Sequence, residues 1–283
     1  MNSPPGDDEL PPVVVPAHLT AALTQFAGYV SPIATLVSEG WQRFVDGFRR
    51  VLEHPVWAEI ADLATRAHAL PPNLQEIRGL ALVGTQCLAE EGITIYAVPR
   101  AATARRLLLA ETPQARRRVL GDCFHSILDD CEAELGRCNR MELVPYARIT
   151  SRAIAAARDG HTEAAQALGA NVVDSLLAQR YGWRRSRDLT NHTKTTSVEL
   201  LSQLAVAEYM VIAPIYASYM AYWPGGGQPV PHRFARHVTT HHAIPRQFSR
   251  RNVAQVLMQA TSLIALFSGE LRVGGAATRV PPG

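Results

Sequence analysis

The helical spacing of apolar residues is the feature that most constrains the fold of this chain. Similar spacing recurs through most of the sequence, and no convincing run alternates apolar and polar residues as a strand does. The i, i+3, i+4, i+7 pattern is clearest near the end of the sequence, at Val253, Val256, Leu257, Ala260, Leu263, Ile264 and Phe267. We therefore predict an all-α protein, in which residues 92–98 (GITIYAV) are the one place where a short strand is expected.

Proline and small polar residues mark the expected helix starts. Ser31-Pro32 predicts a helix toward Leu52, Pro99 one through Leu109, and Thr112-Pro113 one reaching Cys138. Further helices are expected over 144–159, 162–180 and 197–223, and from Ser249 onward. With 283 residues, the chain is long enough for two domains. We predict a disordered leader (1–16), a helical N-terminal domain (17–140), a second helical domain (141–272) and a flexible tail (273–283).

Composition argues against a disordered or membrane-spanning protein. Hydrophobic residues make up 47% of the chain and charged residues 19%, as in ordinary globular proteins. The most apolar stretch, 209–223, contains Pro214 and would span about 22 Å as a helix, short of a bilayer core of about 30 Å. The acidic, proline-rich first residues do not resemble a signal peptide, and the four cysteines have no zinc-type spacing. We expect a water-soluble cytoplasmic protein.

Residues 209–269 contain no aspartate or glutamate but many basic side chains. The arginines within this stretch are Arg233, Arg236, Arg246, Arg250 and Arg251. Interleaved with them are His232, His237, His241 and His242. Such a patch attracts anions, and imidazoles exchange protons near neutral pH. Arg250 and Arg251 lie at a predicted helix start, where cations are unfavourable unless an anion such as phosphate is bound.

Arg236 and His241 are separated by four residues, RHVTTH, the first of which is polar. This pattern resembles the Rx4-6H motif of HEPN-domain ribonucleases. The phrase HRFARHVTTHHAIPRQFSRRNVAQVLMQATSLIALF also resembles the C-terminal part of bacterial HEPN-like proteins, where the motif precedes a long apolar helix. The resemblance covers about the last 130 residues. His242 departs from it, since many relatives have glycine there, and Pro245 lies close by.

The resemblance implies a C-terminal antiparallel helical bundle and a homodimer that cleaves RNA without metal or cofactor. It implies that His241 transfers the proton of the 2′-hydroxyl, that Arg236 stabilises the phosphorane-like transition state, and that His237 orients the phosphate. It also implies a role as a toxin or anti-phage defence effector, with an antitoxin or regulatory partner. Phosphate or RNA contacts are expected from Arg233, Arg246, Arg250 and Arg251.

Other interpretations of these residues stay open. His237 and His241, four residues apart, could bind a metal together with His232, although the arginines would repel a cation. His241 and His242 could equally be exposed loop residues without function. The whole patch could bind nucleic acid or nucleotides without catalysis, or it could belong to a structural dimerisation protein.

Outside the patch, ordinary structural roles are favoured. Cys123, Cys131 and Cys138 share one helical stripe, which favours core packing. His125, Asp129 and Glu132 could hold a metal, but a solvated acidic face is the stronger expectation. The arginines of 116–118 are likewise expected to be ordinary solvated surface residues. The basic run 184–187 follows Trp183, which could stack on a base, in what we expect to be a solvated loop.

Overall fold

The computed structural model of the chain describes residues 70–191, 204 and 206–273. Within these ranges the chain forms helices and no strand, which confirms the predicted all-α class. The α-helices are α4 (Arg78–Glu90), α5 (Ala101–Leu109), α6 (Pro113–Asp122), α7 (Phe124–Leu135), α8 (Val144–Arg158), α9 (Thr162–Thr190), α11 (Val206–Ser218), α12 (Arg236–His241) and α13 (Arg250–Val273). Two 3-10 helices are η1 (Pro72–Ile77) and η2 (Pro245–Gln247).

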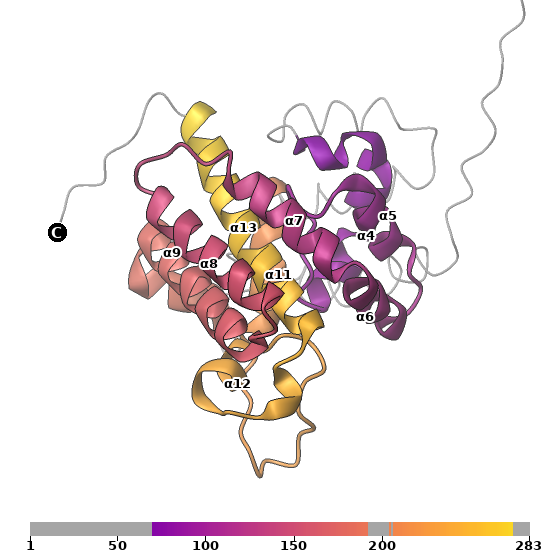
Figure 1. The fold of residues 1–283 in the computed structure, drawn as a ribbon, viewed down its shortest axis with the longest axis vertical. Coiled ribbons are helices and arrows are strands. Elements are labelled where there is room, and N and C mark those ends of the chain that lie inside the picture. Colours follow the sequence, from indigo (N-terminus) through magenta and orange to yellow (C-terminus); the bar gives the residue numbers. More distant parts are fainter. Residues whose placement is uncertain (1–69, 192–203, 205, 274–283) are drawn as a thin grey trace, which may run out of the picture.

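Helix α13 forms the centre of the fold. It runs through the middle of the molecule, with α8 and α9 on one side and α4, α5 and α6 on the other (Figure 1). It packs against α6, α7, α8, α9 and α11, so residues on every side of it are buried between 252 and 264. The predicted apolar positions of α13 are all in the core, but so are Asn252, Gln255 and Gln259 between them.

The core contains residues from both sides of the boundary expected near residue 140. One buried cluster extends from Leu70 to Phe267, and α7 and α8 both pack on α13. The described helices before and after residue 140 therefore share a single core. The proposed leader (1–16), the helix from Ser31 and the first part of the proposed N-terminal domain (17–69) lie outside the described residues, and so does the tail from residue 274 on. The division of the chain into domains stays a prediction.

The helix expected to run from Pro113 to Cys138 is two helices. Its start is as predicted: Pro113 is in the first turn, and the Thr112 hydroxyl accepts a hydrogen bond from the Ala115 amide at 3.1 Å. At Cys123 the backbone leaves helical geometry (φ −95°, ψ 13°), and α7 begins in a new direction. Cys131 in α7 is fully buried, and burial raises the pKa of its thiol to about 12, as expected of a core cysteine.

The expected strand at residues 92–98 is wrong. The segment is buried and irregular, and helix side chains donate to carbonyls of its backbone. Gln259 donates to the Gly92 carbonyl at 2.8 Å, and Ser262 donates to the Tyr96 carbonyl at 2.6 Å. Apolar Ile93 and Ile95 enter the core, which explains why the segment resembles a strand in sequence.

Helix α9 is longer than expected and includes the predicted loop at residues 182–187. Gly182 has a positive φ of 74° and kinks the helix, which then continues to Thr190. Trp183 just after the kink is 69% exposed, and Arg184 and Arg187 are also exposed. The region is therefore solvated as predicted, but it is helical.

Helix α11 is the apolar helix expected over 197–223. Within the described residues it runs from Val206 to Ser218 and contains Pro214, while the expected start at Ser197 lies outside them. None of the described helices has the length and apolar character needed to cross a membrane.

Candidate functional site

Helix α12 carries the Arg236–His241 motif at the narrow end of the molecule, between α11 and α13 (Figure 1). Its inner face is fixed to α9. Val238 is fully buried, and the buried Gln166 side chain donates to the Thr239 hydroxyl at 2.8 Å. A short helix of six residues gains little from its own hydrogen bonds, so these contacts with the core set its position.

Buried amide side chains hold the chain that leads into α12. Gln255 accepts a hydrogen bond from the Phe234 amide at 2.7 Å, and Gln247 accepts one from the Ala235 amide at 2.8 Å. Asn252 in turn donates to the Gln247 carbonyl at 2.6 Å. Two amides that no helix or sheet would satisfy are thus paired inside the core, which fixes the start of α12.

Arg236 is held by an acid that comes from another helix. Its Nη2 and Nε lie 2.7 Å and 3.1 Å from Oδ2 of Asp174 in α9. The hydroxyl of Tyr219 donates to the same carboxylate, and the guanidinium lies over the Tyr219 ring at 5.7 Å. Burial and the Asp174 charge hold the pKa of Tyr219 well above its usual value, so the phenol stays a donor. The expectation that no acid lies near the motif is wrong, because it considered only residues 209–269.

The third guanidinium nitrogen of Arg236 points to His241. Nη1 lies 3.3 Å from Nε2 of His241. Because arginine can only donate, a hydrogen bond between these two atoms makes Nε2 the acceptor. The motif residues predicted from their spacing are thus side by side.

His237 belongs to a group of rings rather than to this pair. Its ring centroid is 4.9 Å from those of both Trp223 and His241, and 5.4 Å from that of His242. Its Nδ1 is buried and has no hydrogen-bond partner. Burial, together with the neighbouring histidines, lowers the pKa of His237, so the neutral form is favoured. Trp223 itself is 65% exposed beside these rings.

No group of three histidine, cysteine, aspartate or glutamate side chains is placed to hold a metal ion in the part of the chain that the structure describes. This applies both to the histidines of the patch and to His125 with its acidic neighbours. Asp129 and Glu132 instead pair with Arg158 of α8, at 2.7 Å and 2.6 Å. The acidic face of α7 is therefore partly neutralised by α8.

The other predicted arginines diverge from the motif. Arg250 lies over the Phe124 ring at 5.8 Å, on the α7 side of α13. Arg251 packs beside Gly121 of α6, where an added Cβ would lie 3.8 Å from its Cγ. Nη2 of Arg246 lies 3.0 Å from Nε2 of His232. The amide at the start of α13 is used within the chain, since Asn252 N donates to the Ser249 hydroxyl at 3.3 Å.

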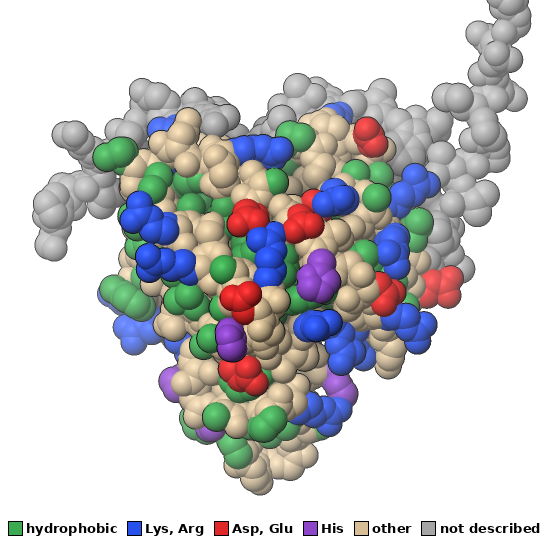
Figure 2. Space-filling view, viewed as in Figure 1, with side chains coloured by type: hydrophobic (Ala, Val, Ile, Leu, Met, Phe, Trp, Pro, Cys, Tyr) green, Lys and Arg blue, Asp and Glu red, His purple; other side chains and the backbone are tan. Residues whose placement is uncertain are grey.

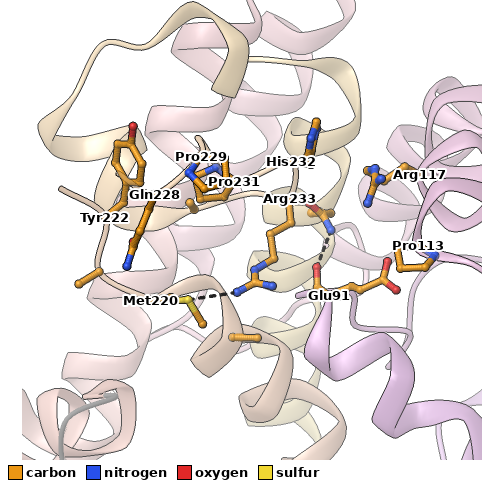
Figure 3. A pocket seen from close by; sticks show the side chains of 14 residues that line it. Glu91, Pro113, Arg117, Met220, Tyr222, Gln228, Pro229, Pro231, His232 and Arg233 are labelled. Atoms are coloured by element: carbon orange, nitrogen blue, oxygen red, sulfur yellow. Dashed lines mark hydrogen bonds between the residues drawn. The ribbon is translucent and has the colours of Figure 1, made fainter. Parts of the chain in front are cut away.

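A second basic group surrounds His232, which we call the His232 cluster (Arg117, His232, Arg233, Arg246, Arg251). The charges of Arg246, Arg117 and Arg251 lower the pKa of His232, with Arg246 contributing most. His232, Arg233 and Arg117 line a pocket of about 420 Å³ (Figure 3). Figure 2 shows histidine side chains on both sides of the narrow end of the molecule, with arginines beside those on one side.

The sequence did not point to three residues that shape these groups. Asp174 and Tyr219 hold Arg236, and Arg117 joins the His232 cluster from α6. Asp174 and Arg117 lie on helices far from the motif in sequence, and Tyr219 lies just after the end of α11, so the spacing within the motif carries no signal for them. The buried glutamines of α13 left a visible trace, because polar residues interrupt a strongly apolar helix at Asn252, Gln255 and Gln259.

Comparison with known proteins adds no family. No protein-family model, no curated protein and no solved structure matches this chain. What the chain does is therefore inferred from the geometry of its own residues.

Proposed function

We propose that this chain cleaves RNA without a metal ion, by HEPN-type chemistry, at the pair formed by Arg236 and His241. The observation that carries the proposal is the 3.3 Å separation of Arg236 Nη1 and His241 Nε2. A fixed cation beside an imidazole supplies the two groups that attack of a 2′-hydroxyl on the adjacent phosphate requires. The Asp174 carboxylate supports this role because it fixes the guanidinium through its other two nitrogens.

In the proposed reaction His241 Nε2 accepts the proton of the 2′-hydroxyl while that oxygen attacks phosphorus. The bond from phosphorus to the 5′-oxygen breaks, which leaves a 2′,3′-cyclic phosphate and a 5′-hydroxyl. With RNA bound, Arg236 Nη1 turns from His241 Nε2 to a non-bridging oxygen, whose charge grows in the transition state, and this leaves Nε2 free to accept the proton. The leaving oxygen takes its proton from His241 of the partner subunit in a homodimer, which enters the step as the protonated imidazolium, whereas the His241 that acts as base enters it neutral.

The surroundings of the pair suit an RNA strand. In the proposal His237 orients the scissile phosphate, and the exposed indole of Trp223 stacks on a neighbouring base. Arg246, Arg250 and Arg251 contact phosphates farther along the strand. A role as a toxin or defence effector with an antitoxin or regulatory partner completes the proposal, because the HEPN resemblance implies it.

A second candidate is RNA binding without cleavage. The observation that favours it is the ion pair with Asp174, which offsets the charge of Arg236, whereas no carboxylate of the described residues pairs with Arg246 or Arg251. In that case the strongest RNA contacts would come from the His232 cluster, and the motif would only position the strand.

Cleavage of end-labelled RNA in excess EDTA tests the proposal. Wild type should produce fragments ending in 2′,3′-cyclic phosphate, while His241→Ala and Arg236→Ala should leave RNA intact. Arg148→Ala, which removes an exposed arginine of α8, is the matched control and should cut normally. Intact RNA with wild type, or equal cutting by the two motif variants, would reject the ribonuclease.

The salt dependence of RNA affinity distinguishes a protein that binds RNA from one that neither binds nor cleaves it. RNA affinity should fall as salt rises, because contacts with phosphates release counterions. If wild type binds RNA with this dependence but leaves it uncut, the second candidate is correct. If it does not bind RNA at all, both candidates are rejected.

A further inference from the structure

The pocket beside His232 combines a charged rim with an apolar wall. It lies where the loop before α12 meets the end of α11 and the start of α6 (Figure 3). Its volume of about 420 Å³ falls in the range of small-molecule sites. Met220, Tyr222, Pro229 and Pro231 form the apolar wall, while Arg117, His232 and Arg233 face the same space.

Arg233 is the clearest sign that this pocket takes an anion. Among the described residues, its guanidinium donates to the Glu90 carbonyl at 3.2 Å and to the sulfur of Met220 at 3.7 Å, and to no carboxylate. Burial lowers its pKa, and the charge of Glu91 offsets this effect only in part. The nearest acid of the pocket, Glu91, is already bonded to Arg116 at 2.6 Å.

The rest of the rim has the same unbalanced charge. Among the described residues no ion pair joins a carboxylate to any arginine of the His232 cluster. Arg246 makes its close contact with the His232 ring, which is not an anion. Cations gathered from α6, η2 and α13 without acidic partners would all gain from one bound phosphate.

The apolar wall restricts what carries that phosphate. Inorganic phosphate would leave Tyr222, Met220 and the two prolines without a partner. An uncharged ring would leave the arginines uncompensated. A ligand with a flat ring and a phosphate group satisfies both parts, because a nucleobase has an apolar face that stacks on such side chains.

We propose that this pocket binds one nucleoside phosphate unit, with its phosphate on Arg117, His232 and Arg233 and its base on the wall of Met220, Tyr222, Pro229 and Pro231. The site uses none of the side chains of the Arg236–His241 pair, so it stands apart from RNA cleavage. The unit is supplied either by a free nucleotide or by a nucleotide within an RNA strand.

Calorimetric titration of the full chain with AMP tests this site. AMP should bind at least about tenfold more tightly than adenosine or inorganic phosphate, since each of these fills half of the pocket. Arg117→Gln and Arg233→Gln should each weaken AMP binding by about tenfold or more, because each removes a charge-assisted hydrogen bond. Arg118→Gln, an exposed neighbour on α6, should leave the affinity unchanged.

Additional measurements identify the source of the nucleotide and show whether a loss of binding reflects misfolding. Ala221→Trp keeps every charge but fills the pocket, which Ala221 lines, and should abolish binding. An adenosine trinucleotide that binds more tightly than AMP, and loses affinity in Arg117→Gln, identifies an RNA strand as the source. His241→Ala should bind AMP like wild type even if cleavage is lost. The proposal is overturned if neither AMP nor the trinucleotide binds, or if Arg117→Gln and Ala221→Trp bind both as wild type does.

Discussion

The Arg236–His241 pair and the His232 cluster contain the same residue types but hold them in opposite ways. Arg236 has a carboxylate on two nitrogens and a tyrosine ring beneath it, so its direction is fixed. The arginines around His232 have no acidic partner in the described part of the chain. An arginine that is already compensated is oriented before any ligand arrives, whereas an uncompensated one gains most when an anion binds.

The difference assigns separate tasks to two groups that the sequence presents as one patch. Orientation matters for a group that acts on a transition state, because its geometry must be set beforehand. Uncompensated charge matters for affinity, because the ligand supplies the missing partner. The two groups should therefore respond differently to matched substitutions.

The largest expected difference is in RNA cleavage by two arginine variants. Arg236→Gln should lower the single-turnover rate by about 100- to 1,000-fold, as loss of a fixed transition-state donor does. Arg246→Gln should change mainly the RNA affinity, by a few fold, since it removes one phosphate contact. Rapid-quench measurements at saturating protein separate rate from affinity, and equal rate losses in both variants would remove the distinction.

Substitution of the buried Gln255, which lies between the two groups, should lower the free energy of unfolding of the whole chain. Gln255→Leu removes the side chain that pairs with the Phe234 amide and the Glu91 carbonyl, leaving both buried groups unsatisfied. We expect the free energy of unfolding in urea to fall by about 2–4 kcal/mol. Gln114→Leu at an exposed site of α6 should change it by less than about 0.5 kcal/mol. Similar midpoints for the two variants would show that Gln255 is not a structural support.

Asp174→Asn tests the orientation of Arg236 by itself. The neutral amide keeps the shape but loses the charge that binds two guanidinium nitrogens, so the cleavage rate should fall by about tenfold with little change in KM. AMP binding at the His232 cluster should be unchanged. Asp174→Glu should recover part of the rate. A change in KM alone would contradict a role in positioning Arg236.

The smallest expected effect concerns the two histidines whose pKa is lowered. Salt should raise the pKa of His232 toward its usual value, because nearby arginine charges lower it and ions screen them. The pKa of His237 should respond much less, because burial is its main cause. Because the pKa of His237 is lower in the folded chain, the unfolded chain binds more protons at acidic pH. The neutral His237 ring therefore does not oppose folding above about pH 6.5, and the free energy of unfolding falls as the pH drops below that value. NMR titration of the imidazoles at low and high salt measures both, and equal salt responses would contradict these causes.

The sequence predicted the parts of this molecule that depend on local pattern. The apolar spacing of α13, the cap at Thr112-Pro113 and the proximity of Arg236 and His241 all follow from residues close together in the chain. The confirmed fold class rests on the same periodicity. Helix ends were less certain, since the break at Cys123 and the continuation beyond Gly182 depend on packing against other helices.

Contacts between distant segments could not be predicted in this way. The absence of acids in 209–269 suggested an unneutralised motif, yet Asp174 reaches Arg236 from 62 positions earlier in the chain. Residues 92–98 have the composition of a strand, but the α13 side chains that satisfy their backbone lie more than 160 positions away. Local spacing of residues does not indicate which helix faces which.

The buried glutamines also determine how the chain before α12 exchanges hydrogen with solvent. The amide hydrogens of Phe234 and Ala235 belong to irregular backbone, which ordinarily exchanges within seconds or minutes. Each is instead bonded to the side chain of Gln255 or Gln247 inside the core, so exchange requires an opening of that core. These loop amides should therefore be protected from hydrogen–deuterium exchange to about the same degree as the amides in the middle of α13.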